Sequence, residues 1–138
     1  MTMTITLANG ATTLALPPDL IWVDRLTWSP VTQNTERSIT GALIVDAAAR
    51  VGGRSITLQG DGDSAWIELS LLQTLRTWSE TPGLQMQLTW GLDAARTVIF
   101  DHGNDETSNA MAMEAVVAYS DPQNTDYYCN LVLRFLEV

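Results

Sequence analysis

"MTITLANGATTLAL", residues 3–16, is the stretch that decides the fold. Met3, Ile5 and Leu7 alternate with threonine, and apolar residues alternate again after Asn9-Gly10. A period of two is typical of a half-buried β-strand, and an Asn-Gly pair is typical of a tight hairpin turn. The stretch therefore predicts two antiparallel strands joined by a short turn.

The same plan recurs further along the chain. Residues 39–60 predict a second hairpin with Gly52-Gly53 at its tip, although the alanine-rich segment 45–51 could instead form a helical turn. Residues 84–100 predict a third hairpin, with its turn near the sequence Gly-Leu-Asp-Ala-Ala. Residues 17–38 predict a short extended segment followed by a polar edge strand or loop. Most of the chain is therefore expected to be antiparallel sheet.

One helix is predicted over residues 65–80. Its apolar residues recur at helical spacing, and the Thr-Pro-Gly sequence at 81–83 provides a stop. The residues of the expected buried face are Ile67, Leu71, Leu75 and Trp78. Two further strands are predicted over residues 110–119 and 127–138, with a polar turn between them.

These elements predict a mainly β, β-rich α+β fold: an antiparallel β-sandwich or barrel built from hairpins, with one packed α-helix. The chain has 138 residues, of which 46% are hydrophobic, so we expect a single domain over residues 1–138 with one core. In the last strand Val132 and Leu136 share a face with Asn130 and Arg134. Both faces of that strand therefore carry apolar residues, which indicates cover by a neighbouring element or subunit.

The charge composition excludes some partners. The formal net charge is −9, from sixteen acidic residues and seven arginines, with no lysine. Nucleic acid and anionic membrane both require basic surfaces, so we expect neither to be bound. We also expect no membrane-spanning segment, because no apolar run approaches about 20 residues. The first ten residues have no basic start and no continuous apolar run, so we expect no signal peptide and an intracellular origin.

The segment "QGDGDSAWIEL", residues 59–69, could be a calcium loop, a phosphate loop or a turn. A calcium loop that starts at Asp61 would place Ala, Trp and Leu where an acid, a glycine and a glutamate are needed. A phosphate loop would need a lysine after the glycines. We therefore expect a turn, with Asp63 or Ser64 capping the helix.

Two other parts of the chain contain residues that could form chemical sites. The loop at 101–109 holds the single histidine, His102, with Asp101, Asp105 and Glu106. These four residues could bind a divalent cation, or one of the carboxylates could act as a base for His102. A solvated loop is the plainer interpretation, because no serine or cysteine lies at a recognised spacing. Cys129 alternates with polar residues in the last strand, so we expect a small buried hydrophobe. We predict no catalytic residue, no metal site and no cofactor, and hence no enzyme.

The five tryptophans could line a sugar-binding cleft, but they belong to different predicted elements. Trp78 and Trp90 fall on predicted core faces. Trp22 and Trp28 lie in an irregular segment, where either core packing or an intermolecular contact would explain them.

Three segments of the chain together show a resemblance. They are "LPPDLIWVDRLTWSPVTQNTERSITGALIV" at 16–45, "WIELSLLQTLRTWSETPGLQMQLTWGLDAARTVIF" at 66–100, and "YYCNLVLRFLEV" at 127–138. In this order they resemble small structural proteins of the tails of double-stranded DNA bacteriophages, in the broad class of distal-tail and baseplate components. Many distal-tail proteins are longer and carry a second, outward domain, so only a core ring domain fits 138 residues.

The resemblance implies a virion structural protein that forms a homo-oligomeric, hexameric ring around the DNA channel of the tail. Its partners would be further copies of itself and the neighbouring tail-tube, baseplate or tail-tip proteins, while DNA passes nearby without being bound. Hairpin tips and the 101–109 loop would reach neighbouring subunits. The candidate interface residues are Trp22, Trp28, Gly52, Gly53, His102 and Asn104. The alternative is a small ligand- or carbohydrate-binding β domain of a tail tip.

Overall fold

The structure is a computed structural model that describes residues 3–50, 53–103 and 110–138. Within these residues the chain forms eleven β-strands and one α-helix. In chain order the elements are β1 (Ile5–Asn9), β2 (Thr12–Leu16), β3 (Ile21–Trp22), β4 (Val31–Arg37), β5 (Leu43–Ala49), β6 (Ser55–Gln59), β7 (Ile67–Glu68), α1 (Leu69–Ser79), β8 (Met86–Trp90), β9 (Arg96–Phe100), β10 (Met111–Ala115) and β11 (Tyr127–Glu137).

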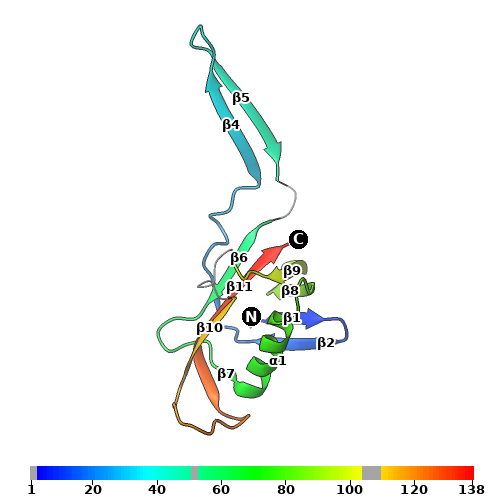
Figure 1. Cartoon of the computed structure of the whole chain (residues 1–138), viewed down its shortest axis with the longest axis vertical. Helices are drawn as coiled ribbons and strands as arrows, with labels where there is room; N and C mark the ends of the chain where they lie inside the picture. The colour runs from blue at the N-terminus through cyan, green and yellow to red at the C-terminus, as the bar shows by residue number, and fades with distance from the viewer. Residues whose placement is uncertain (1–2, 51–52, 104–109) are drawn as a thin grey trace.

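The body of the protein is one antiparallel sheet in the order β2-β1-β8-β9-β11-β6-β3. The long last strand β11 is central to this sheet, because it pairs with β9 and β6 and also with β7 and β10. Alternate residues of β11 are buried, from Cys129 to Phe135, as their period of two predicts. The mainly β, antiparallel fold with a single helix is confirmed (Figure 1).

The sheet curls around one hydrophobic core, as in a β-sandwich. Trp22 of β3 lies edge-on to Trp90 of β8, with ring centroids 5.7 Å apart, although several strands separate β3 from β8 in the sheet. Phe100 and Phe135 pack with ring centroids 4.9 Å apart on the neighbouring strands β9 and β11. The helix adds Leu72, Leu75 and Trp78 to the same core.

The helix begins later than predicted. It starts at Leu69, its N-cap is Glu68, and no side chain caps it, so the predicted capping by Asp63 or Ser64 is wrong. Asp63 and Ala65 have φ values of 61° and 57°, which interrupt any helix there. The chain then forms the short strand β7 against β11 before the helix starts.

Two of the three predicted hairpins are confirmed and one is wrong. The β1–β2 hairpin turns at Gly10 and the β8–β9 hairpin turns after Trp90, as predicted. The predicted hairpin over residues 39–60 is wrong, because β5 pairs with β4 and β6 pairs with β11 and β3. Gly53 is therefore not at a hairpin tip: its N–H donates to the carbonyl of Glu137, 2.8 Å away, beside β6.

Candidate assembly surface: the projecting arm and its base

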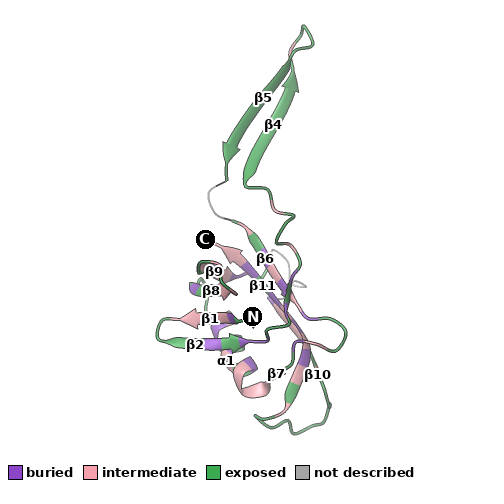
Figure 2. Ribbon diagram, turned by 180° about the vertical axis from the view of Figure 1, so that it is seen from behind, coloured by how far each residue is buried: buried purple, intermediate pink, exposed green. Residues whose placement is uncertain are grey.

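The β4–β5 hairpin projects from the body as a separate two-stranded sheet, which we call the arm (residues 31–49) (Figure 1). All seven residues of β4 and all seven of β5 are exposed (Figure 2). The turn between them is held by Ser38, whose carbonyl accepts from the N–H of Gly41 at 2.9 Å. Strands of seven residues rise about 3.3 Å per residue, so the arm extends roughly 23 Å.

The two faces of the arm differ in chemistry. Residues directly opposite each other in an antiparallel pair share a face. Val31 pairs with Ala49 and Thr35 with Val45, whereas Asn34 pairs with Asp46. What we call the apolar face of the arm therefore carries Val31, Leu43, Val45, Ala47 and Ala49, together with Gln33, Thr35 and Arg37. The opposite face carries Thr32, Asn34, Glu36, Ile44, Asp46 and Ala48.

Such an exposed two-stranded hairpin is unusual in a monomeric protein. A two-stranded hairpin alone is at best marginally stable in water. Leu43 and Val45 on the apolar face are 55% and 48% exposed, and the adjacent Ile39 in the turn is fully exposed. Apolar side chains gathered on one face of an exposed element mark a surface that a partner covers.

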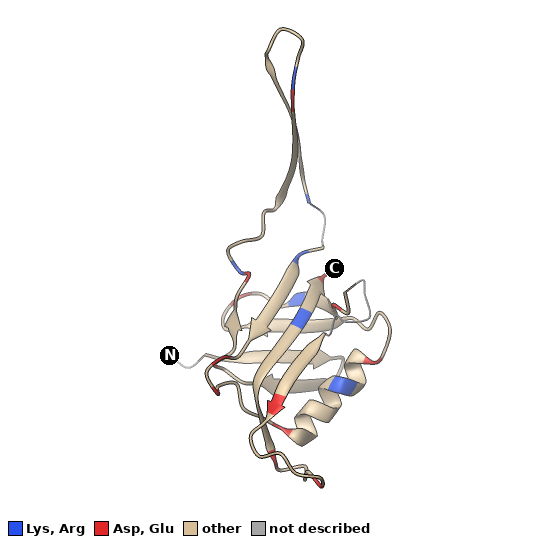
Figure 3. Cartoon of the chain, turned by 60° about the vertical axis from the view of Figure 1, so that its left-hand side comes forward, with Lys and Arg blue, Asp and Glu red and all other residues tan. Residues whose placement is uncertain are grey.

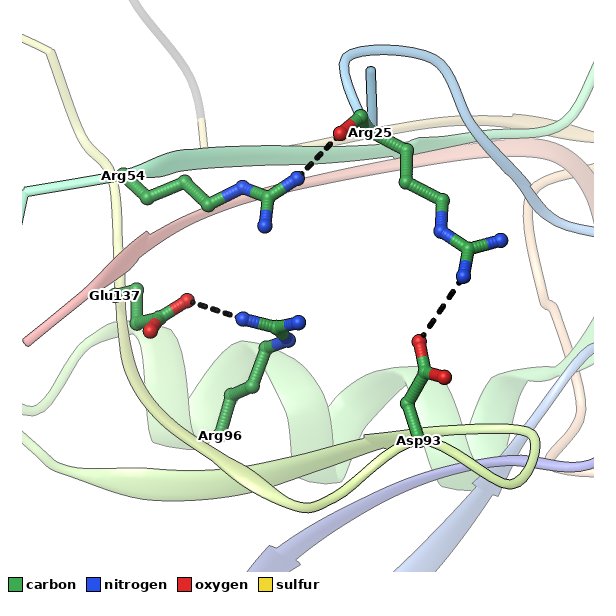
Figure 4. Close-up of polar contacts among 5 residues, drawn as sticks. All are labelled: Arg25, Arg54, Asp93, Arg96 and Glu137. Atoms are coloured by element: carbon green, nitrogen blue, oxygen red, sulfur yellow. Dashed lines mark hydrogen bonds and ion pairs between the residues drawn. The ribbon is translucent and has the colours of Figure 1, made fainter. Parts of the chain in front are cut away.

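Arg54 holds the arm to the body. It follows the arm in the chain, and its guanidinium lies 4.7 Å from the ring centre of Trp22 and 5.3 Å from that of Trp28. The same group donates to the carbonyl of Arg25 at 2.5 Å (Figure 4). Since Trp28 precedes the arm and Trp22 belongs to the body, Arg54 connects both ends of the arm to the sheet.

Two further arginines complete this cluster. Arg25 and Arg96 also lie over the ring of Trp22, at 5.7 Å and 5.4 Å. Arg25 forms an ion pair with Asp93 at 3.3 Å, and Arg96 forms one with Glu137 at 3.0 Å (Figure 4). We call the segment 22–28, with Arg54, Arg96, Asp93 and Glu137, the arm base. Cation–π contacts and ion pairs thus join the segment before the arm, the residue Arg54 after it, and the body strands β9 and β11 at the point where the arm leaves the body.

The candidate interface residues lie in different places. Trp22 is only 6% exposed and packs into the core, whereas Trp28 is half-buried at the arm base. His102 is exposed near Phe100 and lines a groove of about 500 Å³ between α1 and β10. Gly52 and Asn104 lie outside the described residues. The structure does not bring Trp28 and His102 together, and an interface role for the six residues stays a prediction.

The segment at 59–69 is a turn, as predicted. Short-range hydrogen bonds hold it: the Asp61 carboxylate accepts from the N–H of Gly62 at 2.8 Å, and the Ser64 hydroxyl donates to the carbonyl of Asp61 at 2.6 Å. Over residues 3–50, 53–103 and 110–138, no group of three histidines, cysteines or acids is placed to hold a metal ion. In the same ranges, no helix is long and apolar enough to cross a membrane.

Cys129 is buried in the core, as predicted, at 5% exposed. Burial raises the pKa of its thiol, and the charges of Asp63 and Glu114 raise that pKa further. A thiol with a raised pKa is a poor nucleophile.

The sequence prediction missed the arm as a functional element. Its signal was present as an apolar strand, Leu43–Ala49, that directly follows a polar one of equal length. It also missed Arg54, for which no local pattern exists. No protein family, curated protein or solved structure matches this chain.

Proposed function

We propose that this chain is a structural subunit that assembles through its arm, and that it forms a ring in the tail or baseplate of a double-stranded DNA bacteriophage. The observation that carries the assembly is the arm, because fourteen strand residues are ordered outside the core and an apolar face is left in water. The bacteriophage tail as its location rests on the resemblance of the segments 16–45, 66–100 and 127–138.

The arm base supports the same proposal. Binding costs less free energy when the binding element is already held in position. Three arginines and two tryptophans order the two connections by which the arm leaves the body. An arm that extends roughly 23 Å suits contact with an adjacent copy in a closed assembly.

The net charge supports a channel through which DNA passes. A chain of charge −9 without lysine has few groups to neutralise phosphates, so it repels DNA at close range. In the proposed ring, subunits around the tail axis would line a channel to which DNA does not adhere.

The first test is the native mass of the purified protein. We expect light scattering over a concentration series to show a hexamer, and electron microscopy of the same sample to show a ring with a central channel. A chain that stays monomeric at every concentration and shows no ring would contradict the proposal.

Matched variants test the arm itself. Leu43→Ser combined with Val45→Ser alters the apolar face of the arm, and we expect it to abolish assembly. Ile44→Ser combined with Ala48→Ser alters the opposite face by similar chemistry, and we expect assembly to persist. Both pairs are exposed in the isolated chain, so neither should alter the unfolding of the body. Equal loss of assembly in both variants would contradict a specific role for the apolar face.

A further inference from the structure

The molecule carries a second exposed apolar surface, at the end of the body away from the arm. Trp66 is 49% exposed and packs against Tyr127, with ring centroids 5.8 Å apart. Val117 is 69% exposed and lies beside Tyr127, where both line a hollow of about 190 Å³. In Figure 1, β7 and the segment between β10 and β11 lie at the opposite end of the molecule from the arm.

Acidic groups lie among these apolar side chains. Glu68 pairs with Tyr127 across the strands and accepts from its hydroxyl at 3.3 Å. Asp126 lines the hollow and accepts from the hydroxyl of Tyr119. We call this surface the acidic–aromatic patch, and its residues are Trp66, Glu68, Val116, Val117, Tyr119, Asp126 and Tyr127.

Charge is distributed unevenly between the two ends of the molecule (Figure 3). Five of the seven arginines belong to the arm, the residue after it and the arm base, where five acids balance them. These arginines are Arg25, Arg37, Arg50, Arg54 and Arg96. The whole net charge of −9 therefore arises from the rest of the chain, which includes the acidic–aromatic patch.

The arm and the patch are complementary. The apolar face of the arm ends in one cation, Arg37, which lies opposite Leu43 on that face. The patch offers exposed apolar side chains with carboxylates among them and contains no arginine. An apolar surface with one cation and an apolar surface with anions have the complementarity that selects partners and orients them.

We propose that the apolar face of the arm docks on the acidic–aromatic patch of a second copy of this chain. This proposal rests on the proposed self-assembly and names its two surfaces. Because the arm and the patch lie at opposite ends of one molecule, the contact is head-to-tail, and it leaves one free arm and one free patch after each addition. Such a contact continues from copy to copy until a ring closes.

Two variants that each lack one surface test this contact. Leu43→Ser combined with Val45→Ser removes the apolar face of the arm and keeps the patch. Val117→Arg places a bulky cation on the patch and keeps the arm. Each variant alone should lose at least about tenfold in association constant, because apolar burial is lost or like charges are brought together.

The mixture of the two variants is the decisive measurement. The intact arm of Val117→Arg can dock on the intact patch of the arm variant, so we expect a one-to-one heterodimer that grows no further. Light scattering measures the mass of the species in the mixture and in each variant alone, and so distinguishes a heterodimer from monomers. Tyr127→Ser is a second patch variant, should Val117→Arg fail to show the cooperative unfolding of the unaltered chain.

The possible outcomes separate this inference from the proposed function. If the unaltered chain assembles but the mixture stays monomeric, the arm docks elsewhere and this inference is overturned alone. If the patch variant assembles like the unaltered chain, an arm-to-arm or other contact is at work, and the inference is again overturned. If the unaltered chain itself never assembles, both proposals fail.

Discussion

Replacing Arg54 with alanine should destabilise the folded chain by about 2 kcal/mol. The side chain donates one hydrogen bond to the carbonyl of Arg25, and a hydrogen bond from a charged group contributes about 1.5–3 kcal/mol. It also makes cation–π contacts with Trp22 and Trp28, each worth about 0.5–1 kcal/mol where partly exposed. Since Arg54 is only half-buried, water replaces part of these interactions, and about 2 kcal/mol remains.

Urea unfolding followed by tryptophan fluorescence measures this loss, because Trp22 and Trp28 both contact Arg54. The urea concentration at the midpoint of unfolding should fall, while the slope of the unfolding free energy against urea concentration stays unchanged. Arg54→Lys should lie between Arg54→Ala and the unaltered chain, since lysine keeps the charge but lacks the planar group that stacks on a ring.

Arg37→Ala is the matched control. Arg37 is an exposed arm residue with a single hydrogen bond to the carbonyl of Gly41, so its loss should cost less than about 0.5 kcal/mol. If Arg54→Ala and Arg37→Ala had equal effects, the inference that Arg54 holds the arm to the body would be wrong.

Three further predictions concern the body. Gly60→Ala should destabilise the fold by about 1–3 kcal/mol in chemical denaturation, because the added Cβ would lie 2.3 Å from the buried Cβ of Ala65; a neutral effect would contradict this close approach. Tyr119→Phe should raise the pKa of Asp126 toward 3.8 in an NMR titration. The hydrogen bond from the Tyr119 hydroxyl lowers that pKa most, and the hydrogen bond from the N–H of Gln123 lowers it less. The stabilisation from Asp126 is complete above pH 3.8 and is lost as the pH falls through its lowered pKa, so the variant should lose less stability in acid. Cys129 should react with a thiol reagent only as the chain unfolds, and rapid labelling of the folded protein would refute its burial.

Much of the body could be predicted because its signals are local. The β1–β2 hairpin has alternating residues on both sides of Asn9-Gly10, and Gly10 does adopt a positive φ of 61°. The last strand shows its buried positions by a simple period of two. The start of the helix is different, because Ile67 and Glu68 pair with residues about sixty positions later in the chain. A window of sequence that shows helical spacing contains no information about that pairing.

The arm was mispredicted for a related reason. The adjacent glycines at 52–53 predict a hairpin tip, whereas the actual turn uses Ser38 and Gly41. Hydrophobic alternation identifies a strand when a core selects one face, but no core of this chain contacts the strands β4 and β5, which are exposed along their length. The cluster around Arg54 could not be predicted from the sequence either, since its members come from segments that meet only in the folded structure.

The residues on the opposite face of the arm indicate how the arm selects its orientation when the apolar face docks. Glu36 and Asp46 lie on the face opposite Leu43 and Val45, so docking through the apolar face leaves both carboxylates in water. Ionised carboxylates that remain hydrated cost no desolvation energy, whereas docking through the opposite face would bury them. The carboxylates thereby oppose the wrong orientation of the arm. Replacing Glu36 and Asp46 by glutamine and asparagine should leave the unfolding of the body unchanged and should reduce the uniformity of the assemblies seen by electron microscopy. Unaltered, uniform rings would show that apolar contact alone orients the arm.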